Sequence, residues 1–183
     1  MTDLHILGLA GSLRQASRSK ALLRNAQRFL PAGTTLSTFD LAGLPMLNAD
    51  EMDPPPESVV ALRAAIEQAD ALFIATPEYN YGIPAVLKNA LDWASRPAFR
   101  SPLKDKPVAF ATVTPGYVGG ARVSHHLRDV LFGVRALVLP TRETLFGRSG
   151  DLFDDDLVLV NERVQGELAA TLADLREWTL RVR

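Results

Sequence analysis

Residues 77–84 of this chain read Pro77-Glu78-Tyr79-Asn80-Tyr81-Gly82-Ile83-Pro84 and stand between two segments of different pattern. The apolar run 70–76 before them predicts a buried strand, and the apolar spacing of 85–93 after them predicts a helix. The loop therefore falls at the carboxyl end of a strand, the edge where open α/β sheets bind ligands. Its prolines make it stiff, and its glycine allows close backbone approach to a flat group. The stretch predicts a ring-binding surface, although alone it fits ordinary turn chemistry equally well.

Strands and helices alternate outward from this loop along the whole chain. Strands are expected at 4–10, 34–39, 70–76, 107–114 and 136–139, and 141–156 reads as a polar segment. Helices are expected near 20–30, 57–68, 85–93, 121–132 and from Leu157 to Trp178, the last one capped by Asp154, Asp155 and Asp156. The alternation predicts an α/β fold, with a five-stranded parallel sheet of order 2-1-3-4-5 between helices. This is a flavodoxin-like three-layer sandwich, expected as a single domain over residues 1–183.

Composition removes several classes of function. The chain has 183 residues, of which 47% are hydrophobic, and its net charge of −1 gives no field that favours nucleic acid or an anionic membrane. It has no cysteine, so a disulfide framework, an iron–sulfur cluster and a catalytic thiol are excluded. No apolar run approaches the ~20 residues of a membrane span, and the first residues do not resemble a signal peptide. We expect a soluble, cytoplasmic protein.

The loop after the first strand has the chemistry of a phosphate site. Ser12, Ser17 and Ser19 supply hydroxyls, Arg14 and Arg18 supply positive charge, and the helix that follows adds free N–H groups. The loop lacks the spacing of a nucleoside-triphosphate loop and also lacks G-x-G-x-x-G, so a monophosphate is favoured. The alternative is that these serines only cap the helix.

A third loop, Thr114 to Gly120, follows the fourth strand and contains Gly116 and a glycine pair. Because the strand-to-helix loops of a parallel sheet share one edge, a single ligand could touch all three loops. His125 and His126 lie in the next helix with no further ligand at metal-binding spacing. We expect them to be exposed helix or interface residues, and we expect no metal site.

With these residues in hand, the chain resembles the NADPH-dependent FMN reductase family, which includes quinone, chromate and azo reductases. The resemblance covers residues 4 to about 140 and is carried by the following segments: Gly11-Ser12-Leu13-Arg14 with Ser17 and Ser19, Thr76 to Tyr81, Pro84 to Trp93 with its Leu87-Lys88-Asn89-Ala90-Leu91-Asp92 core, and Thr114 to Gly116 with Gly119 to Arg122. The segment 77–93 is the most specific of them. Many relatives have Asn in place of Ser19 and an apolar residue in place of Arg18.

The resemblance implies an FMN site made by the three loops. The FMN phosphate would lie against Ser12, Arg14, Ser17, Arg18 and Ser19. Pro77, Glu78, Tyr79 and Asn80 would line the isoalloxazine ring, largely through backbone groups, and Thr114 and Gly116 would approach it from the next loop. Members of the family tend to form homodimers or homotetramers in which a partner subunit helps to wall the flavin.

The predicted activity is hydride transfer from NADPH or NADH through FMN to a small-molecule acceptor. That acceptor is a quinone, a free flavin, an azo dye or a metal oxyanion. The flavin carries the chemistry and the protein orients it, so no catalytic residue is assigned. Two alternatives stay open at this point: a flavodoxin-like FMN electron carrier and a flavin-free interaction module.

Overall fold

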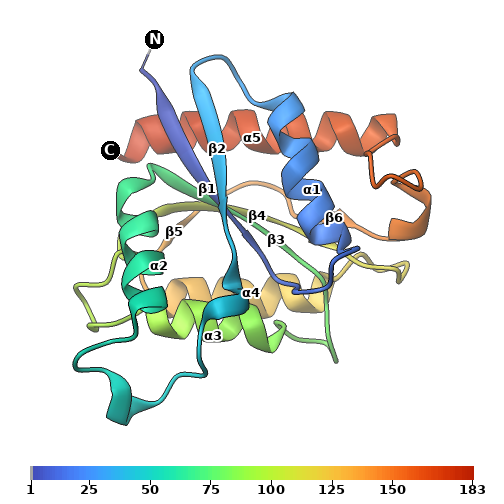
Figure 1. The fold of residues 1–183 in the computed structure, drawn as a ribbon. Coiled ribbons are helices and arrows are strands. Elements are labelled where there is room, and N and C mark those ends of the chain that lie inside the picture. Colours follow the sequence, from blue (N-terminus) through green and yellow to red (C-terminus); the bar gives the residue numbers. More distant parts are fainter. Residues whose placement is uncertain (1) are drawn as a thin grey trace.

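A parallel sheet covered by helices on both faces forms the centre of the computed structural model, which describes residues 2–183 (Figure 1). The strands are β1 (Leu4–Ala10), β2 (Thr34–Phe39), β3 (Ala71–Thr76), β4 (Pro107–Val113), β5 (Leu137–Val138) and β6 (Thr144–Phe146). The helices are α1 (Arg18–Ala26), α2 (Glu57–Gln68), α3 (Ala85–Ala94), α4 (Ala121–Gly133) and α5 (Glu162–Val182), with short 3-10 turns between some of them. Every strand pair is parallel and the order is β2-β1-β3-β4-β5. The predicted fold and strand order are confirmed.

Two hydrophobic cores lie on opposite faces of the sheet. The α1–α5 core contains Leu22, Phe73 and Leu172, and the core under α2, α3 and α4 contains Ile74 and Leu87 among others. Successive residues of a strand point to opposite faces, so the wholly buried β3 sends Phe73 to one core and its neighbour Ile74 to the other. A strand that is buried at every position, and apolar at all but its last, is the pattern expected of a sheet covered on both faces.

The fifth strand position differs from the prediction because two short strands share it. β5 pairs with the start of β4, through Pro107 and Val108, and β6 pairs with its end, from Ala111 to Val113. Pro140 follows β5 and has no N–H to continue a ladder, so the chain leaves the sheet there. The chain rejoins the sheet as β6, where Phe146 is fully buried in the α1–α5 core and the burial of its ring stabilises this return. The expectation of a single strand followed by a polar segment was wrong here.

The start of the last helix also differs from the prediction. α5 begins at Glu162 and not at Leu157, and its N-cap is Asn161, whose side chain accepts a hydrogen bond from the N–H of Val164 at 3.1 Å. The three aspartates do not cap α5: the Asp154 carboxylate accepts from the N–H of Val158 at 2.8 Å in a tight turn before the helix. The apolar residues of this turn imitate the helical spacing of α5, which is why the pattern was misread.

Buried Asn25 of α1 holds this turn in place. Its side-chain amide donates to the carbonyl of Leu157 at 3.0 Å, and its side-chain oxygen accepts from the N–H of Leu159 at 2.9 Å. The turn before α5 is therefore fixed to the helix that follows the first loop. No helix within residues 2–183 combines the length and the apolar character that crossing a bilayer demands.

Candidate functional site

A cleft of about 200 Å³ opens at the carboxyl edge of the sheet, where the three predicted loops meet. Of the predicted site residues, those lining the cleft are Ser12, Arg14, Ser17, Arg18, Ser19, Pro77 and Tyr79. Glu78, Asn80, Thr114 and Gly116 lie in the same loops but do not line it. Ala16, Val113, Pro115 and Ser149 complete the wall. One space thus adjoins residues that are far apart in sequence.

The position of the first loop is determined by its contact with the end of β3. The N–H of Gly11 donates to the carbonyl of Ala75 at 2.8 Å, and a Cβ at this position would overlap the side chain of Thr76. Glycine is needed here because the backbone of the first loop passes directly against the end of β3. The loops after β1 and β3 are consequently held together at the cleft.

The serines of this loop have different roles. Ser17 caps α1, because its Oγ accepts from the N–H of Lys20 at 3.3 Å, so the capping alternative holds for this residue. Ser12 and Ser19 are also buried but do not cap the helix. The first turn of α1 has no acidic residue, so the positive end of its dipole is left without a counter-charge from its own sequence. Hydroxyls and an uncompensated helix N-terminus together favour an anion.

The loop 77–84 contains a tight turn, which is held by two reciprocal backbone hydrogen bonds. The N–H of Tyr79 donates to the carbonyl of Gly82 at 3.2 Å, and the reverse bond is 3.0 Å. Asn80 and Tyr81 have φ values of 49° and 66°, the left-handed pair of a type I′ turn. The ring of Tyr81 lies against Arg122 of α4, whose Cζ is 4.3 Å from the ring centre. These backbone hydrogen bonds constrain the loop in addition to its prolines.

The glycine of this loop serves a different purpose from the one expected. A Cβ at Gly82 would lie 3.2 Å from Nδ1 of His126, and the same nitrogen accepts a hydrogen bond from the N–H of Ile83 at 3.3 Å. The close approach that glycine allows is to the imidazole of His126 on α4. His126 itself is exposed, as expected, and within residues 2–183 no cluster of three metal-ligating side chains is present.

Glu78 joins the same loop to α4. Its Oε2 accepts a hydrogen bond from the N–H of Val123 at 3.0 Å, in the first turn of that helix. The N-cap of α4 is Gly120, at φ 86°, which has no side chain to cap the helix. Glu78 therefore supplies the missing cap and its charge from another loop. This role leaves no pattern in the sequence, because the two residues are 45 positions apart.

The third loop is hydrogen-bonded to the segment after β6, which was not predicted to reach the site. The N–H of Thr114 donates to the carbonyl of Phe146 at 3.0 Å, and the N–H of Ser149 donates to the carbonyl of Thr114 at 3.0 Å. Ser149 is buried, and its Oγ accepts from Nη1 of Arg18 at 3.3 Å. The only sign in the sequence was the pair of glycines at 147 and 150, which flank this serine within a polar stretch. Arg18 thus links the first loop to the segment after β6.

The space beside Gly116 is open: among residues 2–183, apart from the glycine and its two chain neighbours, no heavy atom lies within 4 Å of the position that a Cβ would occupy there. The cations of the cleft are Arg14, which is exposed, and the half-buried Arg18. Burial lowers the pKa of Lys106, but this residue lies at the opposite, amino-terminal edge of the sheet, just before β4. The site is thus a cationic cleft with both polar and apolar walls, and it lies beside an open glycine loop.

The chain matches known proteins over most of its length. The family model described as NADPH-dependent FMN reductase matches residues 4–151. An NAD(P)H-dependent FMN reductase of Pseudomonas aeruginosa is 37% identical, with 99% of this chain and 98% of the relative covered. A quinone reductase of Escherichia coli is 35% identical over 91% of this chain and 93% of its own length. FerB, a flavoenzyme NAD(P)H:(acceptor) oxidoreductase of Paracoccus denitrificans, has a solved structure with a TM-score of 0.89 at 28% identity, covering 97% of this chain and 98% of its own.

Proposed function

The chain belongs to the family of NADPH-dependent FMN reductases, and from that premise we propose that it passes hydride from NADPH or NADH through FMN to a small-molecule acceptor. It is an oxidoreductase whose cofactors are FMN and a reduced nicotinamide. Among the candidate acceptors, a quinone is supported by the relative of 35% identity that is named a quinone reductase. Free flavin, azo dyes and metal oxyanions are the other candidates.

The residues of the cleft fit the two halves of FMN. Ser12, Ser19 and Arg14 lie near an α1 N-terminus that lacks a counter-charge, and these are donors and cations that suit a phosphate monoester. Val113 and Pro115 give the same cleft apolar wall, which suits a planar ring. The observation that carries the proposal is that one cleft combines hydroxyl and cationic side chains with an apolar wall.

The contacts that we propose are those that the family resemblance implies for the three loops. The hydroxyls of Ser12, Ser17 and Ser19 and the guanidinium groups of Arg14 and Arg18 would hold the phosphate. Pro77 and the backbone of Glu78 and Asn80 would flank the ring, since the N–H of Tyr79 is already donated to Gly82. Thr114 and Gly116 would approach from the third loop, where the open space at Gly116 leaves room.

FMN, when bound, supplies the chemistry by accepting hydride and giving it to the acceptor. The protein holds the ring, keeps one face accessible and excludes water with the apolar wall of the cleft. Tyr79, whose side chain is 52% exposed, is placed to contact an incoming nicotinamide or acceptor. Because positioning alone supplies most of the acceleration for such a transfer, no acid or base of this chain is required.

Rapid mixing of the FMN-loaded protein with NADPH or NADH tests this function. A reductase loses the oxidised flavin absorbance within one turnover and regains it when an acceptor is added. A panel of quinone, free flavin, azo dye and metal oxyanion then identifies the acceptor. Flavin that binds tightly but is reduced far more slowly than any acceptor turnover would instead indicate an electron carrier. A protein that never binds FMN would indicate a flavin-free module.

We also propose that the protein is a homodimer or homotetramer and that it works in the cytoplasm. Phe132 of α4 is 83% exposed and Tyr117 of the third loop is 86% exposed, so both side chains are available to contact a second copy. Burying them against a second copy would place the partner next to the third loop. Light scattering during gel filtration measures the mass, and a monomer at micromolar concentration would contradict this assignment.

A further inference from the structure

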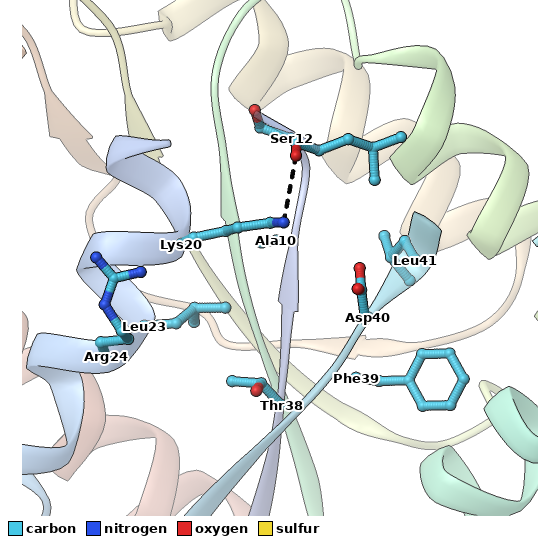
Figure 2. A pocket seen from close by; sticks show the side chains of 10 residues that line it. Ala10, Ser12, Lys20, Leu23, Arg24, Thr38, Phe39, Asp40 and Leu41 are labelled. Atoms are coloured by element: carbon cyan, nitrogen blue, oxygen red, sulfur yellow. Dashed lines mark hydrogen bonds between the residues drawn. The ribbon is translucent and has the colours of Figure 1, made fainter. Parts of the chain in front are cut away.

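A second hollow, of about 280 Å³, shares Ser12 with the flavin cleft and lies between α1 and the carboxyl end of β2 (Figure 2). None of the contacts assigned to FMN above uses this space apart from Ser12. Its two sides come from different elements: cationic side chains project from α1, and polar and apolar side chains come from the end of β2 and the residues after it.

The α1 side presents two positive charges. Lys20 and Arg24 are four residues apart, so they lie one above the other on the same helix face. Nζ of Lys20 donates to the carbonyl of Leu13 at 3.3 Å, which holds the ammonium group over the hollow (Figure 2). Within residues 2–183, neither cation forms an ion pair with a carboxylate. Two cations without acidic partners at the mouth of a hollow favour an anionic ligand such as phosphate.

The opposite side presents the groups that a sugar and a flat base require. Asp40 directly follows β2 and uses one carboxylate oxygen, Oδ1, to accept from the N–H of Ala42 at 3.1 Å, so Oδ2 is left for a ligand. The hydroxyl of Thr38 adds a second polar group. An acidic side chain at the end of the second strand is well placed to accept from the hydroxyls of a ribose. The apolar surface of the hollow comes from the buried Leu41 on this side and from Leu13, 45% exposed, in the loop after β1.

We propose that this hollow binds a nucleoside phosphate, with the phosphate at Lys20 and Arg24, the ribose at Asp40 and Thr38, and the base against Leu13 and Leu41. The site lies directly beside the loop assigned to the flavin phosphate. Two sources share this chemistry: the adenosine phosphate half of the nicotinamide dinucleotide, and the same half of FAD bound in place of FMN. The choice between these sources rests on the proposed function, whereas the binding of a nucleotide does not.

Calorimetric titration of the FMN-loaded protein with 5′-AMP, adenosine 2′,5′-bisphosphate and inorganic phosphate tests the site. The double variant Lys20→Gln/Arg24→Gln is expected to bind both nucleotides about tenfold more weakly or worse, the size of one lost charge-assisted hydrogen bond. The matched control is Arg142→Gln/Arg181→Gln, which also removes two positive charges, both from exposed side chains outside the hollow. Asp40→Asn should weaken the nucleotides and leave inorganic phosphate unchanged. Equal affinities in the double variant and the control, or no nucleotide binding to the wild-type protein, would overturn the proposal.

Two further measurements identify the source. A higher KM for NADPH or NADH in the double variant, with unchanged kcat and unchanged FMN affinity, assigns the hollow to the nicotinamide substrate. A loss of FAD affinity without loss of FMN affinity assigns it to the dinucleotide flavin. A protein that binds 5′-AMP here but is never reduced by nicotinamide would retain the nucleotide site and refute the proposed function, so the two failures are distinguishable.

Discussion

Arg14 is the exposed cation of the flavin cleft, and the proposed contact with phosphate makes its removal measurable. Arg14→Ala should weaken FMN binding by about 1.5–3 kcal/mol, because a charge-assisted hydrogen bond to phosphate is lost. This corresponds to a dissociation constant raised by about 10- to 150-fold, measurable by fluorescence titration. Arg181→Ala, which removes an exposed charge near the end of α5, is the control. An unchanged constant in Arg14→Ala would remove this residue from the site.

Glu78 has a structural task that can be separated from flavin binding. Because its carboxylate caps α4 through the N–H of Val123, Glu78→Ala should lower the free energy of unfolding by about 1 kcal/mol. Glu78→Gln keeps an acceptor oxygen but loses the favourable charge at the helix N-terminus, so it should cost less. Urea denaturation of the FMN-free protein measures both. Equal stability of all three proteins would show that the cap contributes nothing.

At the level of single residues, the sequence indicated which side chains of one loop lie together but not the contacts between distant segments. Ser12, Arg14 and Ser19, which line the cleft, were singled out because hydroxyls and cations lie close together in sequence before a helix. Ser149 was missed because it reaches the same cleft only through the hydrogen bonds of the third loop to the segment after β6. Such a contact leaves no local pattern, since it depends on how two distant segments pair.

Among the elements, the strands with a continuous apolar or a regularly alternating pattern were predicted, whereas the short β6 was not. The wholly buried β3 and β4 were found because apolar residues fill every position except Thr76 in β3 and Thr112 in β4. β6 has three residues and lies in a polar segment, so only its pairing with the end of β4 and the burial of Phe146 define it. The predicted start of α5 was wrong because Asp154 and Asn161 are both suitable N-cap residues in the sequence. Only the hydrogen bond that each side chain accepts shows which of them caps the helix.

The corrected start of α5 gives a test at the level of the helix. Asn161→Ala should lower the free energy of unfolding by about 1 kcal/mol, because the N–H of Val164 loses its acceptor at the N-terminus of a 21-residue helix. Asp155→Ala, an exposed residue of the aspartate run, should change stability by less than about 0.5 kcal/mol. Thermal and urea denaturation of both variants and of the wild-type protein measure these changes in the free energy of unfolding. If Asp155→Ala were the more damaging of the two, the cap would be misassigned.

For the molecule as a whole, the ligand should stabilise the fold because the site is made by loops from separate parts of the chain. FMN at 100 times its dissociation constant should add about 2.7 kcal/mol to the free energy of unfolding. For a chain of 183 residues this raises Tm by about 5–11 °C. Riboflavin has the same ring without the phosphate, so at equal concentration it should give a clearly smaller shift. Thermal denaturation with each flavin measures the difference. Equal shifts would mean that the serine and arginine loop after β1 does not hold the phosphate, and the assignment of that loop would have to be abandoned even if the protein reduces acceptors.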